Sequence, residues 1–120
     1  MGKMLIVDDS RLSRKKLRAI LESGDHEVVA EAVDGKDGFE KYKEFQPDVT
    51  LLDITMPIMN GFECLDAIKA ENADARCIMV SAIGSPDALT NAIQKGADNY
   101  ITKPYNSEDV LEVIEETLED

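Results

Sequence analysis

Two kinds of segment alternate along the chain. Short apolar runs of four to six residues recur five times, and between them lie longer segments whose apolar residues are spaced three or four apart. The short runs predict buried strands, and the periodic segments predict amphipathic helices. We therefore predict strands over residues 3–7, 27–32, 48–52, 76–81 and 99–102.

Start and stop signals bound the periodic segments. Asn60 is followed three positions later by Glu63, which resembles a capping box, and Ser85-Pro86 gives an N-cap followed by proline at the first helical position. The first helix is expected to end at Gly24 and to place Leu12 on its apolar face with Leu17, Ile20 and Leu21. The predicted helices cover residues 10–24, 35–45, 60 onward, 85–96 and 107–118.

Five strands that alternate with five helices predict an α/β domain with a parallel sheet and right-handed crossovers. The 120 residues suffice for one domain and are too few for two ordinary ones. We expect a single domain over residues 1–120, without an output domain.

The charge balance bears on partners. The net charge is −12, from 25 acidic and 13 basic residues, which argues against binding to nucleic acid through phosphate contacts. No apolar run approaches the roughly 20 residues of a membrane span, and the first residues do not form a signal peptide. A cytoplasmic protein with a protein or cation partner is expected.

Cysteine and histidine give little indication of chemistry. Cys64 and Cys77 lie in periodic segments and are predicted to be small buried residues. The single histidine, His26, lies in "SGDHEVV", which is interpreted as a surface turn, and it has no carboxylate or cysteine cluster beside it.

The carboxyl ends of the predicted strands carry polar and charged residues that indicate chemistry. The first strand ends in Asp8-Asp9, the third in Asp53 and the fourth in Ser81, and Lys103 closely follows the fifth. Singly, each has another explanation, since an aspartate can cap a helix and a lysine can be a solvated charge. Ligands of open parallel sheets bind outside the carboxyl ends of the strands, so the agreement of four strand ends predicts a site.

Three clustered carboxylates need compensation. Two of them at 4 Å repel each other by about 4 kcal/mol at an effective dielectric near 20. They must therefore protonate or share a cation, and ligands that are all oxygen suit Mg²⁺. With Lys103 and Ser81 opposite, a carboxylate such as Asp53 is equipped to attack a phosphoryl group.

Four motifs together resemble a known family. "LIVDDS", "LLDITMPIMNG", "VSA" and "YITKP" occur in this order and span the chain. They are similar to the motifs of receiver domains of two-component response regulators, most closely the stand-alone, CheY-like kind. The resemblance implies a flavodoxin-like doubly wound (βα)5 fold with strand order 2-1-3-4-5.

The resemblance also implies a metal site and its acceptor. Asp53 would be the phospho-accepting aspartate. Asp9 would bind Mg²⁺ directly and Asp8 partly through water, and the backbone carbonyl of Thr55 would complete the ligand set with Asp53.

A switch is implied as well. Ser81 would bond a phosphoryl oxygen, and Lys103 would pair with the phosphate or with Asp53. Tyr100 would be the aromatic switch residue, and the peptide bond before Pro104 would be cis.

The function implied is signal transfer by a monomer. A histidine kinase or phosphotransfer protein would donate the phosphoryl group, and a target protein, with the flagellar motor switch as a candidate, would read the altered surface. Chemotaxis is the expected setting, and a phosphorelay intermediate is the alternative. Self-phosphorylation and autodephosphorylation do not make the protein an enzyme with a separate substrate.

Two other classes fit less well. Haloacid-dehalogenase-like phosphatases also use a strand-end aspartate with Mg²⁺, but they need a second aspartate where this chain has Thr55. A nucleotide- or flavin-binding module shares the fold class, but the chain has no glycine-rich phosphate loop.

Basic residues gather in the first predicted helix of this acidic protein. The cluster is interpreted either as a solvated face or as a docking surface for the phosphodonor. Its members are Arg11, Arg14, Lys15, Lys16 and Arg18.

Overall fold

The computed structural model describes residues 2–82 and 85–119. Five strands form one sheet in the order β2-β1-β3-β4-β5, and every neighbouring pair is parallel. The predicted flavodoxin-like topology is therefore confirmed. The strands are β1 (Lys3–Val7), β2 (Glu27–Ala32), β3 (Val49–Leu52), β4 (Cys77–Ser81) and β5 (Asn99–Thr102).

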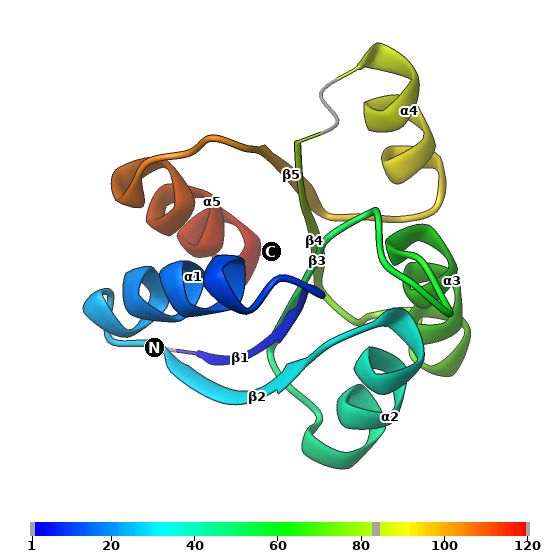
Figure 1. Ribbon diagram of the computed structural model, residues 1–120, viewed down its shortest axis with the longest axis horizontal. Helices are drawn as coiled ribbons and strands as arrows, with labels where there is room; N and C mark the ends of the chain where they lie inside the picture. The colour runs from blue at the N-terminus through cyan, green and yellow to red at the C-terminus, as the bar shows by residue number, and fades with distance from the viewer. Residues whose placement is uncertain (1, 83–84, 120) are drawn as a thin grey trace.

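Helices cover both faces of the sheet. Helices α1 and α5 lie on one face, and α2, α3 and α4 lie on the other (Figure 1). The chain moves from β1 to β2 in one direction and then from β2 through β3 and β4 to β5 in the other, so right-handed crossovers place α1 on one face and α2, α3 and α4 on the opposite face. The helices are α1 (Arg11–Ser23), α2 (Gly35–Phe45), α3 (Gly61–Glu71), α4 (Pro86–Gln94) and α5 (Ser107–Glu119).

The core is divided by the sheet into two apolar layers. Successive residues of β3 point to opposite faces, so Leu51 packs in the layer beneath α1 and α5 and Leu52 in the layer beneath α2 and α3. Each is almost completely buried, which is worth about 1.5–3 kcal/mol for a leucine side chain. Cys64 and Cys77 are buried and free, as predicted, and burial raises the pKa of each thiol to about 12.

Helix caps agree with the sequence signals. Asn60 and Glu63 form a complete capping box at the start of α3, and the Ser85 side chain accepts a hydrogen bond from Ala88 N at the start of α4. Ser10 caps α1 by accepting from Ser13 N at 3.2 Å. Because Ser10 takes this role, Asp8 and Asp9 are not N-caps.

Two positional predictions were wrong. Leu12 is 77% exposed, because the apolar face of α1 is covered only over its second half, at Leu17, Ile20 and Leu21. His26 is buried rather than on a surface turn. Its Nδ1 accepts from Gly2 N at 3.1 Å, and its Nε2 lies 3.2 Å from Glu115 Oε1 on α5, so distant segments cover the turn.

None of the helices within residues 2–82 and 85–119 combines the length and apolar character that a membrane span requires.

Candidate functional site

The carboxyl edge of the sheet brings the predicted residues together. Asp8 and Asp9 follow β1 and Asp53 follows β3, and one oxygen from each carboxylate lies within 4.8 Å of the others. Ser81 is the last residue of β4, and Lys103 directly follows β5. The site is thus assembled from four strand ends.

Sheet hydrogen bonds hold the backbone of this edge. Asp53 N donates to Val7 O at 2.9 Å, and Asp8 N donates to Ala32 O at 3.0 Å. Across the edge, Lys103 N donates to Ser81 O at 2.8 Å. The strand register therefore fixes where each side chain begins.

Asp8 is the most buried of the three carboxylates. Its Oδ1 accepts from Ser10 N at 2.9 Å, and its Oδ2 accepts from Lys103 Nζ at 3.0 Å. The resemblance implied that Lys103 pairs with phosphate or with Asp53, whereas the ion pair in this structure is with Asp8. A buried charge is the costliest to leave unpaired, and Asp8 is only 6% exposed.

Lys103 remains a cation in this environment. Burial lowers its pKa, but the hydrogen bond to Asp8 and the negative charges of Asp53 and Asp8 outweigh that effect. The pKa of Lys103 is consequently raised above its ordinary value. The ammonium thus supplies a permanent positive charge at the strand ends.

Asp53 is half-buried and shares its surroundings with like charges. Its Oδ1 accepts from Ile54 N at 2.8 Å. Burial raises its pKa most; Lys103 opposes the rise, and the charges of Asp8 and Asp9 add to it. The net pKa is above the ordinary value, so further positive charge beside Asp53 would stabilise its ionised form.

Gly61 allows the start of α3 to lie against Asp53. A Cβ at this position would lie 2.0 Å from the Asp53 carbonyl oxygen, and Gly61 N donates to Ile54 O at 2.8 Å. The sequence signals predicted the N-cap of this helix at Asn60 and gave no packing role to Gly61. The close approach of two backbones is visible only in three dimensions.

The remaining predicted residues lie around this edge. Thr55 is exposed in the loop two residues beyond Asp53, and the Lys103–Pro104 peptide bond is cis. Ser81 is buried, and its side chain is hydrogen-bonded to that of Tyr100. Burial raises the pKa of Tyr100 above its ordinary value, although the bond to Ser81 acts in the opposite direction.

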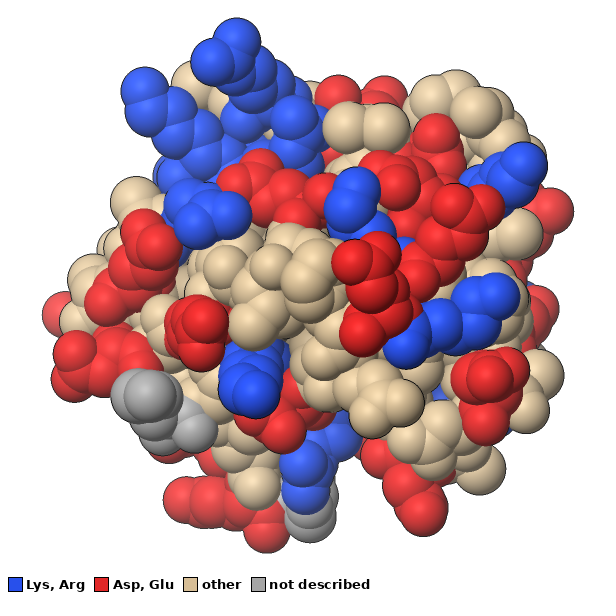
Figure 2. Space-filling view, turned by 90° about the horizontal axis from the view of Figure 1, so that it is seen from below, with Lys and Arg blue, Asp and Glu red and all other residues tan. Residues whose placement is uncertain are grey.

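The basic cluster of α1 divides into paired and exposed members. Glu31 on β2 accepts from Arg14 Nε at 3.0 Å and from Arg18 Nε at 2.6 Å. Lysine and arginine side chains gather at the upper left of Figure 2, on the side of the molecule where α1 lies. The exposed members are Arg11, Lys15 and Lys16.

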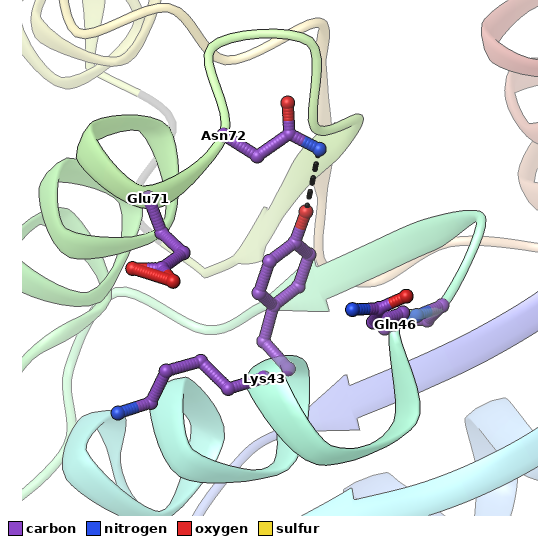
Figure 3. A pocket seen from close by; sticks show the side chains of 6 residues that line it. Lys43, Gln46, Glu71 and Asn72 are labelled. Atoms are coloured by element: carbon purple, nitrogen blue, oxygen red, sulfur yellow. Dashed lines mark hydrogen bonds between the residues drawn. The ribbon is translucent and has the colours of Figure 1, made fainter.

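A hollow lies at the opposite, amino end of the sheet. Its volume is about 410 Å³, and Tyr42 OH in its wall accepts from Asn72 Nδ2 at 3.2 Å (Figure 3). None of the predicted site residues lines it. Its walls are formed by Tyr42, Lys43, Gln46, Pro47, Glu71 and Asn72.

The carboxylates at the site suit a hard divalent cation. All three candidate side chains offer oxygen, the ligand type that Mg²⁺ prefers, and their mutual repulsion is relieved by a shared positive charge. Burial and, to a smaller extent, the charges of Asp8 and Asp9 raise the pKa of Asp53, and a cation beside it would favour its ionised form. The residues present therefore fit Mg²⁺.

Comparison with protein families identifies the class. The model of the response regulator receiver domain matches residues 4–115. The chain belongs to the response regulator receiver domain family.

Within that family, the similar proteins include chemotaxis proteins. The chain is 47% identical over 116 residues to the chemotaxis protein CheY of Bacillus subtilis, which covers 97% of both chains. It is 45% identical over 115 residues to CheY of Listeria monocytogenes, covering 96% of this chain and 97% of the relative. The chain is thus homologous to CheY.

Solved structures agree in fold. A chain of the crystal structure of the CheX-CheY-BeF3-Mg+2 complex from Borrelia burgdorferi superposes with a TM-score of 0.93 at 37% identity, covering 95% of this chain and 87% of that one. The receiver domain protein (CheY-like) from Methanospirillum hungatei superposes with a TM-score of 0.91 at 32% identity, covering 99% and 94%.

Proposed function

We propose that Asp53 accepts a phosphoryl group from the phosphohistidine of a kinase or phosphotransfer protein. An Asp53 carboxylate oxygen forms a bond to phosphorus while the phosphorus–nitrogen bond breaks and the imidazole leaves. The observation that carries this proposal is the placement of Asp53 beside two further carboxylates and a permanent ammonium at one sheet edge.

The surrounding side chains are placed to balance charge during this transfer. The Lys103 ammonium can pair with a phosphoryl oxygen, and the Ser81 hydroxyl can donate to another. Asp8, Asp9 and Asp53, with the backbone carbonyl of Thr55, would hold Mg²⁺, which when bound neutralises charge on the phosphoryl oxygens. The chain's own groups thus supply the nucleophile and its electrostatic frame.

Removal of the group needs only water. Water attacks phosphorus, the bond to Asp53 breaks, and inorganic phosphate leaves with the carboxylate restored. Both steps act on the protein itself, so this is self-directed chemistry without a separate substrate. A phosphatase of the haloacid-dehalogenase kind would need an acid or base where Thr55 lies.

Ser81 and Tyr100 form the proposed switch. Their side chains are hydrogen-bonded to each other, and phosphate on Asp53 would compete for the Ser81 hydroxyl with a bond worth about 1.5–3 kcal/mol. Loss of the Ser81 bond would shift the position of the Tyr100 ring and the surface formed with α4 and α5. A ligand shifts such an equilibrium only through its different affinity for the two states.

The setting we propose is chemotaxis in the cytoplasm, with the protein acting as a monomeric single domain. Support comes from the relatives named chemotaxis protein CheY, which match over nearly their whole length. The partners would be a phosphodonor and a target protein, with the flagellar motor switch as a candidate. A phosphorelay intermediate would instead return its phosphoryl group to a phosphotransfer histidine, which a transfer assay distinguishes.

The test is phosphorylation of purified protein with acetyl phosphate, followed by intact-protein mass spectrometry. We expect a labile gain of one phosphoryl mass that requires Mg²⁺ and disappears in Asp53→Asn. Asp74→Asn, at an exposed turn away from the site, is the matched control and should behave like wild type. A gain that persists in Asp53→Asn would disprove the assignment of the acceptor.

A further inference from the structure

An ionic network on β2 and α1 reaches the site from outside it. The Glu31 Oε1 atom accepts from Arg14 Nε at 3.0 Å, and its Oε2 atom accepts from Arg18 Nε at 2.6 Å. A terminal guanidinium nitrogen of Arg14 also donates to the backbone carbonyl of Asp8 at 2.8 Å. Arg14 therefore bridges a carboxylate on β2 and the backbone of the proposed metal site.

Arg14 differs from its neighbour Arg18 in burial and in contacts. The Arg14 side chain is 14% exposed and that of Arg18 is 37% exposed. The second partner of Arg18 is Glu22 on the helix surface, at 3.3 Å. Only Arg14 of the two arginines bonds to the backbone of the site, and its planar fork is held from two sides.

Glu31 is an anionic anchor for this arrangement. Burial raises its pKa, but the hydrogen bonds from Arg18 and Arg14 outweigh burial, and the pKa is lowered below its ordinary value. The carboxylate is therefore ionised at neutral pH. It orients the Arg14 guanidinium through a charge-assisted hydrogen bond.

The carbonyl that Arg14 holds belongs to the peptide group that joins Asp8 to Asp9. A peptide group is planar, so fixing this carbonyl also fixes the amide nitrogen and Cα of Asp9. The preceding peptide is held by the bond from Asp8 N to Ala32 O at 3.0 Å. The peptide before Asp8 is thus bonded directly to β2 and the peptide after it is bonded to β2 through Arg14, so the backbone from which the exposed Asp9 side chain extends is held in place.

We propose that Arg14, oriented by Glu31, is a positioning residue that holds the Asp8–Asp9 peptide so that the Asp9 carboxylate is ready to bind a divalent cation. The inference rests on the proposed metal site. Arg14 acts through backbone geometry and touches neither the cation nor the phosphoryl group. Glu31 acts one step further away, through Arg14.

Electrostatics and positioning predict opposite signs when Arg14 is removed. Loss of a positive charge near three carboxylates would, through charge alone, make Mg²⁺ bind more tightly. Loss of the support for the Asp8–Asp9 peptide makes Mg²⁺ bind more weakly. Residues that orient metal ligands typically contribute about 10–100-fold in metal affinity.

The experiment measures the Mg²⁺ dissociation constant of the unphosphorylated protein by isothermal titration calorimetry. We expect Arg14→Ala to raise the constant by about tenfold. Arg18→Ala is the matched control, since it removes an equal charge from the same carboxylate and leaves the bond to Asp8; its constant should stay level or fall. An Arg14→Ala protein that binds Mg²⁺ as tightly as wild type overturns the proposal.

Two further measurements keep the test decisive. Arg14→Lys retains the charge and lacks the fork, so if Arg14→Ala fails to fold, weaker Mg²⁺ binding by Arg14→Lys supports the proposal and unchanged binding overturns it. In folded variants, Glu31→Gln should weaken binding in wild type and add nothing in the Arg14 variant. Additive effects would mean that Glu31 acts independently of Arg14, against the proposal.

The same titrations distinguish failure of the proposed Mg²⁺ site from failure of the positioning role of Arg14. Wild-type protein that binds no Mg²⁺ would overturn the metal site and this inference together. Wild-type protein that binds Mg²⁺, with an unchanged Arg14 variant, would overturn the positioning role alone. The Asp9 amide resonance of metal-free protein should also shift in Arg14→Ala and stay in place in Arg18→Ala.

Discussion

The two ends of the sheet use aspartate in opposite ways. At the amino end, Asp98 accepts from Cys77 N at 2.8 Å and from Lys69 Nζ at 3.3 Å, and Asp48 accepts from Lys3 N at 2.8 Å. At the carboxyl end, three carboxylates lie within 4.8 Å of one another around a single lysine. The aspartates at the amino end have their hydrogen-bond donors within the fold, whereas the three carboxylates at the carboxyl end repel one another and would be stabilised by further positive charge.

This difference separates structural acids from functional ones. A carboxylate whose hydrogen bonds are supplied by backbone amides and a lysine stabilises the fold and has little further affinity for a ligand. Carboxylates that repel one another destabilise the fold and gain most from a cation or a phosphoryl group with its metal. The hollow at the amino end (Figure 3) has a volume of about 410 Å³ but is lined by none of the predicted site residues, so shape alone does not locate the site.

The largest expected effect on stability comes from replacing one glycine by alanine at each end of the sheet. Gly61→Ala places a Cβ 2.0 Å from the Asp53 carbonyl, so we expect a loss of about 3 kcal/mol in the free energy of unfolding and loss of Mg²⁺ binding. Gly96→Ala, before β5, places a Cβ in ordinary van der Waals contact with the Lys69 side chain but forces alanine to φ 94°, with a loss of about 1–2 kcal/mol. Urea unfolding and calorimetry measure both quantities.

Gly96→Ala should leave Mg²⁺ affinity unchanged, because the strain lies at the far end of the sheet. Equal losses of Mg²⁺ affinity in both variants would show that the two ends are not independent, and the comparison would fail.

Removing one aspartate at each end of the sheet should have smaller effects on the free energy of unfolding, and the two effects should have opposite signs. Both are measured with EDTA present. Asp98→Ala removes the acceptor of Cys77 N and one of the two acceptors of Lys69 Nζ, the other being Ala75 O, and should lower the free energy of unfolding by about 1–3 kcal/mol. Asp53→Ala relieves repulsion with Asp8 and Asp9 and should raise it by less than about 1 kcal/mol, since solvent screens a half-exposed group. Destabilisation by both variants would remove the distinction between the two kinds of acid.

The smallest expected effect is a difference in pH dependence, measured by urea unfolding of metal-free protein in steps above and below pH 4. The pKa of Asp53 is raised from its ordinary value of 3.8, so around these two pKa values the folded state binds more protons than the unfolded state. Stability therefore falls as pH rises from below 3.8 through the folded pKa. The pKa of Glu31 is lowered from 4.5, so its contribution is present above pH 4.5 and is lost as pH falls through the folded pKa.

Asp53→Asn should therefore remove a decline in stability with rising pH, and Glu31→Gln should remove an increase. If the two substitutions change the slope in the same direction, the electrostatic description of one of these carboxylates is incorrect.

The sequence allowed the strand ends to be predicted because their signals are local. An apolar run that stops at Asp53, or at Asp8 and Asp9, marks both the strand and its polar end, and parallel topology then brings these ends to one edge. The capping box at Asn60 and Glu63 is likewise contained in four residues and was predicted correctly.

What could not be predicted depends on contacts between distant segments. His26 is buried by Gly2 and by α5, and neither leaves a trace in the pattern around the histidine. The bond from Arg14 to the Asp8 carbonyl joins a helix to a strand end through geometry that residue spacing does not encode. The choice of Asp8 over Asp53 as the partner of Lys103 depends on burial, which was known only from the structure.

The ion pair between Lys103 and Asp8 joins residues 95 positions apart in the sequence. Strands β1 and β3 can bring the three aspartates together as soon as residues 3–53 have paired, but the lysine arrives only when β5 has joined the sheet. A partly folded chain therefore carries a cluster of repelling charges that closure of the last strand relieves. Completion of the proposed site thus depends on closure of the sheet, and a molecule in which β5 has not joined it lacks the lysine near Asp53.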